Sequence, residues 1–152
     1  RAAPVDSVDN SVRKIIYDMA QTMYAALGIG LAATQVNIHR RIIVVDVSQE
    51  KNDLRALINP TIYDQFGETE TEEGCLSLPG ITLPVMRSES VIVHAQDQYG
   101  KSFNMVADGI LAVCIQHEID HLDGKVMVDY LSRLKRDRLR KRILRERSQE
   151  YG

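Results

Sequence analysis

The sequence feature that most constrains the fold is an apolar helical segment, residues 109–123, that contains the run His117-Glu118-Ile119-Asp120-His121. Apolar residues cover most of the circumference of this helix, which predicts that it lies in the core. Residues four apart stack on one face of a helix, so His117 and His121 are expected to grip one metal ion together. Two imidazoles and a carboxylate buried without a metal would be costly to desolvate, and this favours a metal site.

Such a site needs a third protein ligand, because catalytic zinc-type sites use three and leave one position open for water. Glu118, beside His117, is placed to take a proton from that water. An extended motif would require a histidine at position 127, where Met127 stands, and a thioether does not replace imidazole at a hydrolytic metal. A downstream glutamate would have to come from a strongly basic segment.

Cys75 is the better candidate for the third ligand, because thiolate binds borderline-soft metals strongly. It lies between an acidic pair, Glu72 and Glu73, and a Pro-Gly turn. A Cys75–Cys114 disulfide is the alternative, but two cysteines in a chain of 152 residues argue against a disulfide framework. The sequence therefore predicts a His-His-Cys site with one open position.

Three segments, in this order along the chain, resemble the signature motifs of peptide deformylases. The resemblance covers nearly the whole chain and implies one catalytic α+β domain over residues 1–152, with short antiparallel sheets around the motif helix and a helix over residues 132–148. Family members usually begin with a further segment ahead of the position that matches Arg1. The motifs are Gly28-Ile29-Gly30-Leu31-Ala32-Ala33-Thr34-Gln35, Glu73-Gly74-Cys75-Leu76-Ser77 and Gln116-His117-Glu118-Ile119-Asp120-His121-Leu122.

The resemblance implies a metal-dependent amidohydrolase that removes the N-formyl group from formylmethionine at the start of new polypeptides. The Gln35 amide and the Leu76 backbone N–H would stabilise the oxyanion. Glu73 and Arg87 are expected to pair and hold the Cys75 loop. Thr82 stands where some bacterial members carry an arginine near the substrate. The residues expected to contact the substrate are Ile29, Gly30, Ile110, Val113 and Cys114.

The resemblance also implies iron(II) as the metal in the cell, although a His-His-Cys set suits zinc, nickel or cobalt as well. The expected partners are N-formylmethionyl nascent peptides, with neither a membrane nor DNA among them. The expected location is the cytoplasm, or an organellar matrix in a eukaryote. No run of apolar residues in the sequence is long enough to span a membrane.

Periodicity predicts further elements around the motif helix. Residues 10–27 show apolar side chains at helical spacing, with Asp9, Asn10 or Ser11 as the cap and Gly28 as the stop. Residues 41–47 form a β-branched run typical of a buried strand, and residues 91–95 and 102–106 indicate two strands joined by a turn. Asp108 is the expected cap of the motif helix. Asn59-Pro60 and Gly67 indicate turns.

The charge of the chain is segregated. Residues 133–147 carry nine Lys and Arg against two acids, a net charge of +7, whereas the rest of the chain sums to −9. Such a basic arm is expected to dock on a polyanion, which the resemblance suggests is the ribosome. The alternative is a solvated helix that keeps an acidic protein soluble.

The sequence admits three other interpretations. Gly28-Ile29-Gly30 followed by Ala33 and Asp46 resembles a dinucleotide fingerprint, but that motif must follow a strand, and here a helix precedes it. A zinc endopeptidase would share the His-Glu motif. An RNA-binding module with a structural metal would need a fourth protein ligand, and no further Cys or His is placed to supply one.

Overall fold

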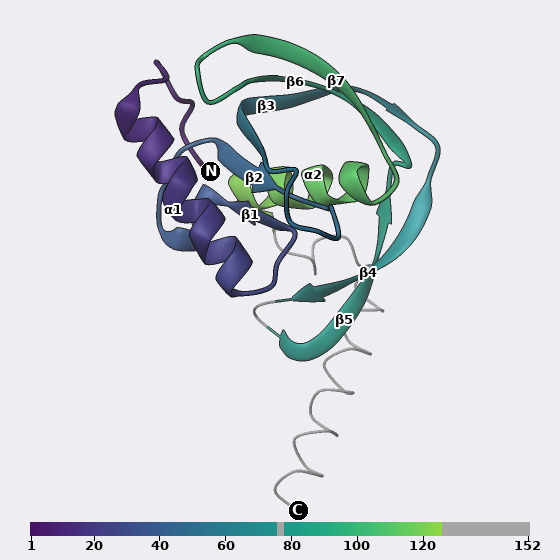
Figure 1. The fold of residues 1–152 in the computed structure, drawn as a ribbon. Helices are drawn as coiled ribbons and strands as arrows, with labels where there is room; N and C mark the ends of the chain where they lie inside the picture. The colour runs from purple at the N-terminus through teal and green to yellow at the C-terminus, as the bar shows by residue number, and fades with distance from the viewer. Residues whose placement is uncertain (76–77, 126–152) are drawn as a thin grey trace, which may run out of the picture. The chain divides into compact units, whose positions relative to one another are not determined.

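The computed structural model describes residues 1–75 and 78–125, without the side chains of residues 75 and 78–81. These parts contain two α-helices, a short 3₁₀-helix and seven strands in antiparallel sheets, which confirms the predicted α+β class (Figure 1). The chain divides into two compact units. The first comprises Arg1–Thr69 and Arg87–Lys125, and Glu70–Met86 belongs to the second. The predicted helix at 132–148 lies outside the described residues, and a single domain over the whole chain stays a prediction.

Helix α1, Asn10–Ala25, begins as the sequence predicts, with Asp9 as its N-cap. The Asp9 side chain accepts a hydrogen bond from the backbone N–H of Val12. The helix ends two residues before the predicted end, and Leu27, with φ of 57°, takes the left-handed conformation that was expected of Gly28. The N–H of Gly28 then donates to the carbonyl of Met23 and closes the helix end.

Strand β2, Ile42–Val45, is buried on both faces, as its unbroken apolar run predicts. Ile42 and Val44 pack against one face of α1, which presents Val12, Ile16, Met19 and Met23. Ile43 and Val45 point the other way, into the cluster that contains the apolar residues of α2. The two helices therefore cover opposite faces of the sheet at β2 (Figure 1).

The larger sheet has the order β1-β2-β3-β6-β7, and all its neighbouring strands are antiparallel. Strands β6 and β7 and the turn between them confirm the predicted hairpin, in which the Asp97 carbonyl accepts from the N–H of Gly100. The strands are β1 (Gly30–Ala32), β2 (Ile42–Val45), β3 (Arg55–Phe66), β6 (Ser90–Gln96) and β7 (Ser102–Asp108).

The predicted turn at Asn59-Pro60 was wrong, because both residues lie inside β3. The register between β3 and β6 shifts between Ile58 and Thr61, and Asn59 has a φ of 53° at this irregularity. The Asn59 amide both accepts from the N–H of Val5 and donates to the carbonyl of Val5, so the side chain holds the N-terminal segment to the sheet. A bulge of this kind tolerates a proline and a left-handed asparagine.

The smaller sheet pairs β4 (Thr69–Cys75) with β5 (Leu78–Arg87). Gly67, with φ of 68°, lies between β3 and β4 and confirms the predicted turn. Periodicity did not predict β4, because a strand rich in threonine and glutamate lacks the apolar alternation of a half-buried strand. The hydroxyl of Thr71 donates to the Glu73 carboxylate, and its oxygen lies 3.2 Å from the Val85 carbonyl oxygen on the neighbouring strand.

Asp46, only 1% exposed, organises the connection that follows β2. Its carboxylate accepts hydrogen bonds from the Tyr24 hydroxyl at 2.7 Å and from the backbone and hydroxyl of Ser48. Burial alone would raise the pKa of Asp46, but these hydrogen bonds outweigh it and hold the pKa below its ordinary value. Asp46 is therefore a structural residue of this connection. This role argues against Asp46 as the ribose-binding acid of a dinucleotide site.

Replacing Tyr24 should reveal how much this buried contact stabilises the fold. Tyr24→Phe is expected to lower the free energy of unfolding by about 1–3 kcal/mol, because it removes a hydrogen bond to a charged acceptor. Tyr17→Phe is the matched control, since Tyr17 lies on the same helix with 64% of its surface exposed. Urea denaturation at neutral pH measures both, and equal losses in the two variants would contradict the structural role of the contact.

The same contact predicts a pH dependence. Burial and the hydrogen bond to Asp46 raise the pKa of Tyr24 to about 12. A tyrosine in the unfolded chain loses its proton near pH 10, so the contribution of Tyr24 to stability is complete below about pH 10 and is lost as the pH rises toward 12. The difference in unfolding free energy between the wild type and Tyr24→Phe should therefore shrink over this range.

Candidate active site

Helix α2, Gly109–Leu122, carries the His-Glu motif and lies where the sequence predicts a core helix. Asp108 occupies the N-cap position, but its carboxylate accepts from the Ser90 hydroxyl and makes no bond to the helix N–H groups. The cap prediction was thus right in position and wrong in mechanism. Gly124, with φ of 74°, ends the segment as predicted. The buried side of α2 consists of Ala112, Cys114, Ile115, Gln116, Glu118 and Leu122.

The imidazoles of His117 and His121 converge, as the four-residue spacing predicts. Their Nε2 atoms lie 3.0 Å apart, and the ring planes are inclined at 75°. Two nitrogens bound to one tetrahedral zinc at about 2.0–2.1 Å would lie roughly 3.3 Å apart. One potential ligand atom each from His117, Glu118 and His121 lies within 4.8 Å of the others. The donor set and its spacing therefore fit a single divalent metal ion.

Glu118 lies deeper than the two histidines and is 5% exposed. Strand β1 packs directly against it. A Cβ atom added to Gly30 would lie 2.6 Å from the Glu118 Oε2 atom and 2.6 Å from the Cys114 Sγ atom. The carboxylate is therefore held against the backbone of β1, beside His117, where it can serve a water molecule.

The helix is also secured at Gln116, the residue before the first histidine. The buried Gln116 side chain accepts from the N–H of Ser88 and donates to the carbonyl of Ser88, both at 2.9 Å. A buried primary amide is satisfied in this way by backbone groups on the connection between β5 and β6. These two hydrogen bonds hold α2 in position along its axis, next to the residue from which the His117 side chain projects.

Asp120, between the two histidines in sequence, pairs with Arg87. The Nη1 atom of Arg87 donates to the Asp120 Oδ2 atom, and Arg87 is 5% exposed. Removal of one partner from an ion pair with this little exposure strongly destabilises the fold, because the other charge is left buried without compensation. This Arg87–Asp120 pair was not predicted from the sequence. The expected Glu73–Arg87 pair stays a prediction.

The segment that contains Gln35 lies at the C-terminal end of α2. This 3₁₀-helix, η1, spans Ala33–Val36, and the Thr34 hydroxyl donates to the His121 carbonyl at 3.1 Å. The Gln35 Oε1 atom accepts from the backbone N–H of Ala32 at 2.9 Å, which orients the amide with its NH₂ group as the remaining donor. This orientation suits the predicted role of Gln35 as an oxyanion donor.

Cys75 is the last residue of β4, and the described structure does not include its side chain or residue 76. The thiolate ligand and the Leu76 N–H donor therefore stay predictions. The neighbouring residues Glu72 and Glu73 accept hydrogen bonds from threonine hydroxyls of the same sheet. The Thr82 hydroxyl donates to the Glu72 carboxylate at 3.1 Å, so Thr82 is an exposed partner of β4.

The predicted substrate-contact residues are brought together in part. Cys114 donates through its Sγ atom to the Ile29 carbonyl at 3.6 Å, and Gly30 lies against Cys114. Val113 is half-buried on α2, and Ile110, in the first turn, is 61% exposed. The contact of Gly30 with Glu118 was missed by sequence reasoning, which assigned Gly30 to close approach of a peptide. A Gly-x-Gly pair in a sequence indicates tight packing, but it does not identify the residue that the glycine contacts.

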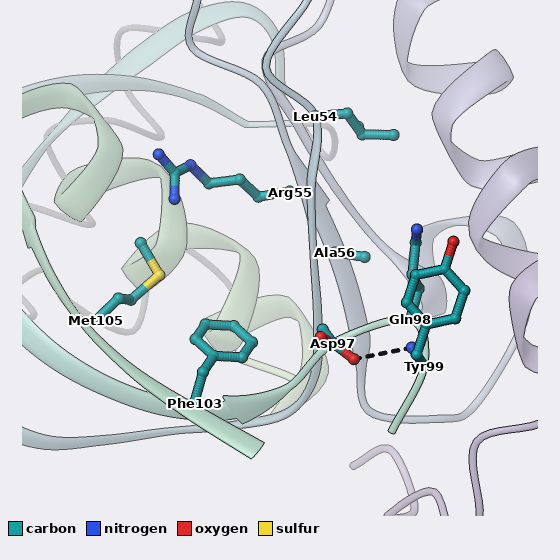
Figure 2. A pocket seen from close by; sticks show the side chains of 8 residues that line it. All are labelled: Leu54, Arg55, Ala56, Asp97, Gln98, Tyr99, Phe103 and Met105. Atoms are coloured by element: carbon teal, nitrogen blue, oxygen red, sulfur yellow. Dashed lines mark hydrogen bonds between the residues drawn. The ribbon is translucent and has the colours of Figure 1, made fainter. Parts of the chain in front are cut away.

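A surface pocket of about 320 Å³ lies in the first unit and contains none of the predicted site residues (Figure 2). Its wall includes the β6–β7 turn, where the Asp97 carboxylate accepts from the N–H of Tyr99 at 2.9 Å. Arg13 of α1 donates to the Gln98 carbonyl and steadies this turn. The pocket is lined by Leu54, Arg55, Ala56, Asp97, Gln98, Tyr99, Phe103 and Met105.

Residues 1–137 match the family model described as Polypeptide deformylase. The chain is 53% identical over 149 residues to a peptide deformylase of Azotobacter vinelandii, covering 97% of this chain and 89% of that protein. It is 55% identical over 143 residues to peptide deformylase 1 of Burkholderia multivorans, covering 93% and 79%.

Solved structures agree with these relatives. The peptide deformylase of Legionella pneumophila superposes with a TM-score of 0.84 at 44% identity, covering 99% of this chain and 89% of that one. The Synechococcus elongatus peptide deformylase in complex with actinonin gives a TM-score of 0.81 at 46% identity, covering 87% and 73%. With sequence, fold and the convergent histidines of α2 in agreement, the chain belongs to the peptide deformylase family.

Proposed function

We propose that His117, His121 and Cys75 hold the divalent metal of this deformylase and that Glu118 is its general base. The enzyme removes the N-formyl group from formylmethionine at the start of new polypeptides and releases formate. The observation that carries the proposal is the cluster on α2, where two converging imidazoles adjoin a buried carboxylate. Cys75 enters from its chemistry and its place in the motif, since thiolate completes a three-ligand set.

A divalent metal ion bound there supplies Lewis-acid chemistry, raising the acidity of water and polarising the formyl oxygen. We propose iron(II) in the cell, with zinc, nickel or cobalt able to occupy the same ligands. Imidazole and thiolate donors suit all four metals, and the order of affinity alone does not select among them.

The residues of the chain have distinct roles in the reaction. Glu118 takes a proton from the attacking water and later delivers one to the leaving amine of methionine. The Gln35 NH₂ group, oriented by the bond from Ala32 to its Oε1 atom, donates to the oxygen on which negative charge develops. The Leu76 N–H is proposed as the second donor. A formyl carbon carries hydrogen where other acyl groups carry carbon, so a tight site would admit formyl and reject larger groups.

The methionine side chain needs an apolar slot. We propose that Ile29 and Cys114 form its inner part, because Cys114 is buried and its thiol contacts the Ile29 carbonyl. Val113 and the exposed Ile110 lie on α2 toward its N-terminal end and would complete the outer part. An apolar slot for a thioether selects by shape and burial of area, with few polar contacts.

The direct test is formate release from formyl-Met-Ala, with metal content measured on the same sample. Turnover that rises in proportion to bound metal supports the proposed site. Substrates with acetyl in place of formyl, and peptides with a free N-terminus, are the matched controls. Cleavage of internal peptide bonds in preference to formyl groups would support the zinc endopeptidase instead and contradict this proposal.

We further propose that the basic segment at residues 133–147 binds the ribosome. These residues lie outside the described structure, so the proposal rests on their net charge of +7. Binding of Lys and Arg to phosphates releases condensed counterions. This release is less favourable at a higher salt concentration, so the affinity falls steeply as salt rises. The nine basic residues are Arg133, Lys135, Arg136, Arg138, Arg140, Lys141, Arg142, Arg145 and Arg147.

Ribosome co-sedimentation at low and high salt tests this role. The intact chain should sediment with ribosomes at low salt and dissociate at high salt, and a chain ending at Ser132 should sediment far less than the intact chain at low salt. A full-length variant with Arg140, Lys141 and Arg142 changed to glutamine separates charge from length. Equal sedimentation of all three forms would leave the segment without this role.

No helix in the described residues is long and apolar enough to cross a membrane.

A further inference from the structure

Gly30 is the residue of β1 that lies closest to the proposed general base. Pairing with β2 places Gly30 opposite Val45, so the position of its Cα atom is set by the sheet. The backbone of Gly30 is not in the left-handed region, so its extended conformation is open to any residue. Glycine is therefore required at this position for space.

The space that a side chain would need is filled by two groups on one face of α2. A Cβ atom on Gly30 would lie 2.6 Å from the Cys114 Sγ atom, 2.6 Å from the Glu118 Oε2 atom and 3.1 Å from the Glu118 Cγ atom. Cys114 and Glu118 are four residues apart, so they stack on the same helical face. Both residues are buried, and the surrounding core is close-packed and resists displacement.

We infer that Gly30 is a positioning residue for Glu118. The bare backbone of β1 forms the wall against which the carboxylate rests, and Cys114 forms the adjacent wall one turn earlier on α2. Together they restrict the side-chain rotamers of Glu118 and hold the carboxylate beside His117. This inference rests on the proposed role of Glu118 as the general base. It assigns to Gly30 a function distinct from the peptide contact expected from sequence.

Gly30→Ala should displace the Glu118 carboxylate. Contacts of 2.6 Å are shorter than carbon tolerates, so the carboxylate, the thiol or the strand must move by several tenths of an ångström. Misplacement of a reacting group by about 1 Å can cost around 10²-fold in rate. We expect kcat to fall by about 10–100-fold, because two of the three atoms nearest to the new methyl group belong to Glu118. Metal content should remain at the wild-type level.

Gly28→Ala is the matched control. Its added Cβ would meet the Met23 carbonyl oxygen at 3.5 Å and the Met23 Cγ atom at 3.6 Å, which are ordinary contacts. The substitution is chemically identical, lies two residues away and has the same effect on the flexibility of the unfolded chain. Its kcat should stay close to that of the wild type. Melting temperature and metal stoichiometry, measured on both variants, separate loss of position from loss of fold.

A double-mutant cycle with Glu118→Gln decides whether Gly30 acts through Glu118. Once the base is removed, Gly30→Ala has no base left to misplace, so it should lower the residual rate by no more than about twofold. A repeat of the 10–100-fold loss in the Glu118→Gln background would overturn the inference, because the residue would then act on the substrate or on the fold.

Two further outcomes separate this inference from the proposed function. If Glu118→Gln loses turnover while Gly30→Ala keeps it, the base is correctly assigned and the positioning role of Gly30 is wrong. If Glu118→Gln itself keeps turnover, both fail. Should Gly30→Ala not fold, the same cycle is run in Cys114→Ala, in which one of the two 2.6 Å contacts is absent.

Discussion

Glu118→Gln should keep metal at the wild-type stoichiometry and lose deformylation by about 10²–10⁴-fold, the range typical of a missing general acid–base group. The amide has the shape of the carboxylate, so it can occupy the same place against Gly30. It cannot accept and deliver the proton, because it remains neutral at the pH of the reaction. The two imidazoles, whose Nε2 atoms lie 3.0 Å apart, are unchanged, so both proposed histidine ligands are retained.

Formate release and metal analysis on the same preparation measure this effect. Glu89→Gln is the matched control, since Glu89 is exposed in the connection between β5 and β6. This control should retain the wild-type rate. Loss of metal from Glu118→Gln would make the glutamate a ligand, and a rate near that of the wild type would remove it from the chemistry.

The second large effect is expected for Cys75→Ser. A serine hydroxyl is neutral and a poor ligand for borderline-soft metals, so the variant should lose metal or change its metal preference. Deformylation should fall with the metal content. In the cobalt-loaded protein, absorption from thiolate-to-metal charge transfer should disappear, which reports the ligand independently of turnover.

Cys114→Ser provides the matched control for this experiment. It makes the same chemical change at a buried cysteine whose Sγ atom contacts the Ile29 carbonyl. The control should keep its metal and its cobalt spectrum, although a hydroxyl packs less well than a thiol at that place. Unaltered metal occupancy and spectrum in Cys75→Ser would exclude Cys75 as a ligand and leave the third position to another residue.

Two buried contacts on α2 hold the helix that carries the two proposed histidine ligands. The Gln116 amide is bound to both backbone groups of Ser88, and the Asp120 carboxylate is paired with Arg87. They flank His117 on either side in sequence, so rotation or sliding of the helix would break both. Rigid support of this kind is what a metal site needs, because ligand geometry must be kept within fractions of an ångström.

Local periodicity was sufficient to predict several parts of this protein. The convergence of His117 and His121 follows from the four-residue repeat of a helix, which does not depend on the rest of the fold. The burial of β2 follows from an unbroken apolar run, since a strand with apolar residues on both faces must be covered on both. Three motifs in order also identified the family, because each motif alone occurs in other kinds of site but their combination in this order is specific.

Only the tertiary structure showed how these parts meet. The bulge at Asn59, the clamp between Gln116 and Ser88 and the contact of Gly30 with Glu118 each join residues far apart in sequence or depend on strand register. Sequence periodicity describes one element at a time, so it indicates that Gly30 lies in a tight place but not which atoms fill it. Those distances arise when β1, fixed by its pairing with β2, packs against α2, and side-chain volumes in a close-packed core then decide them.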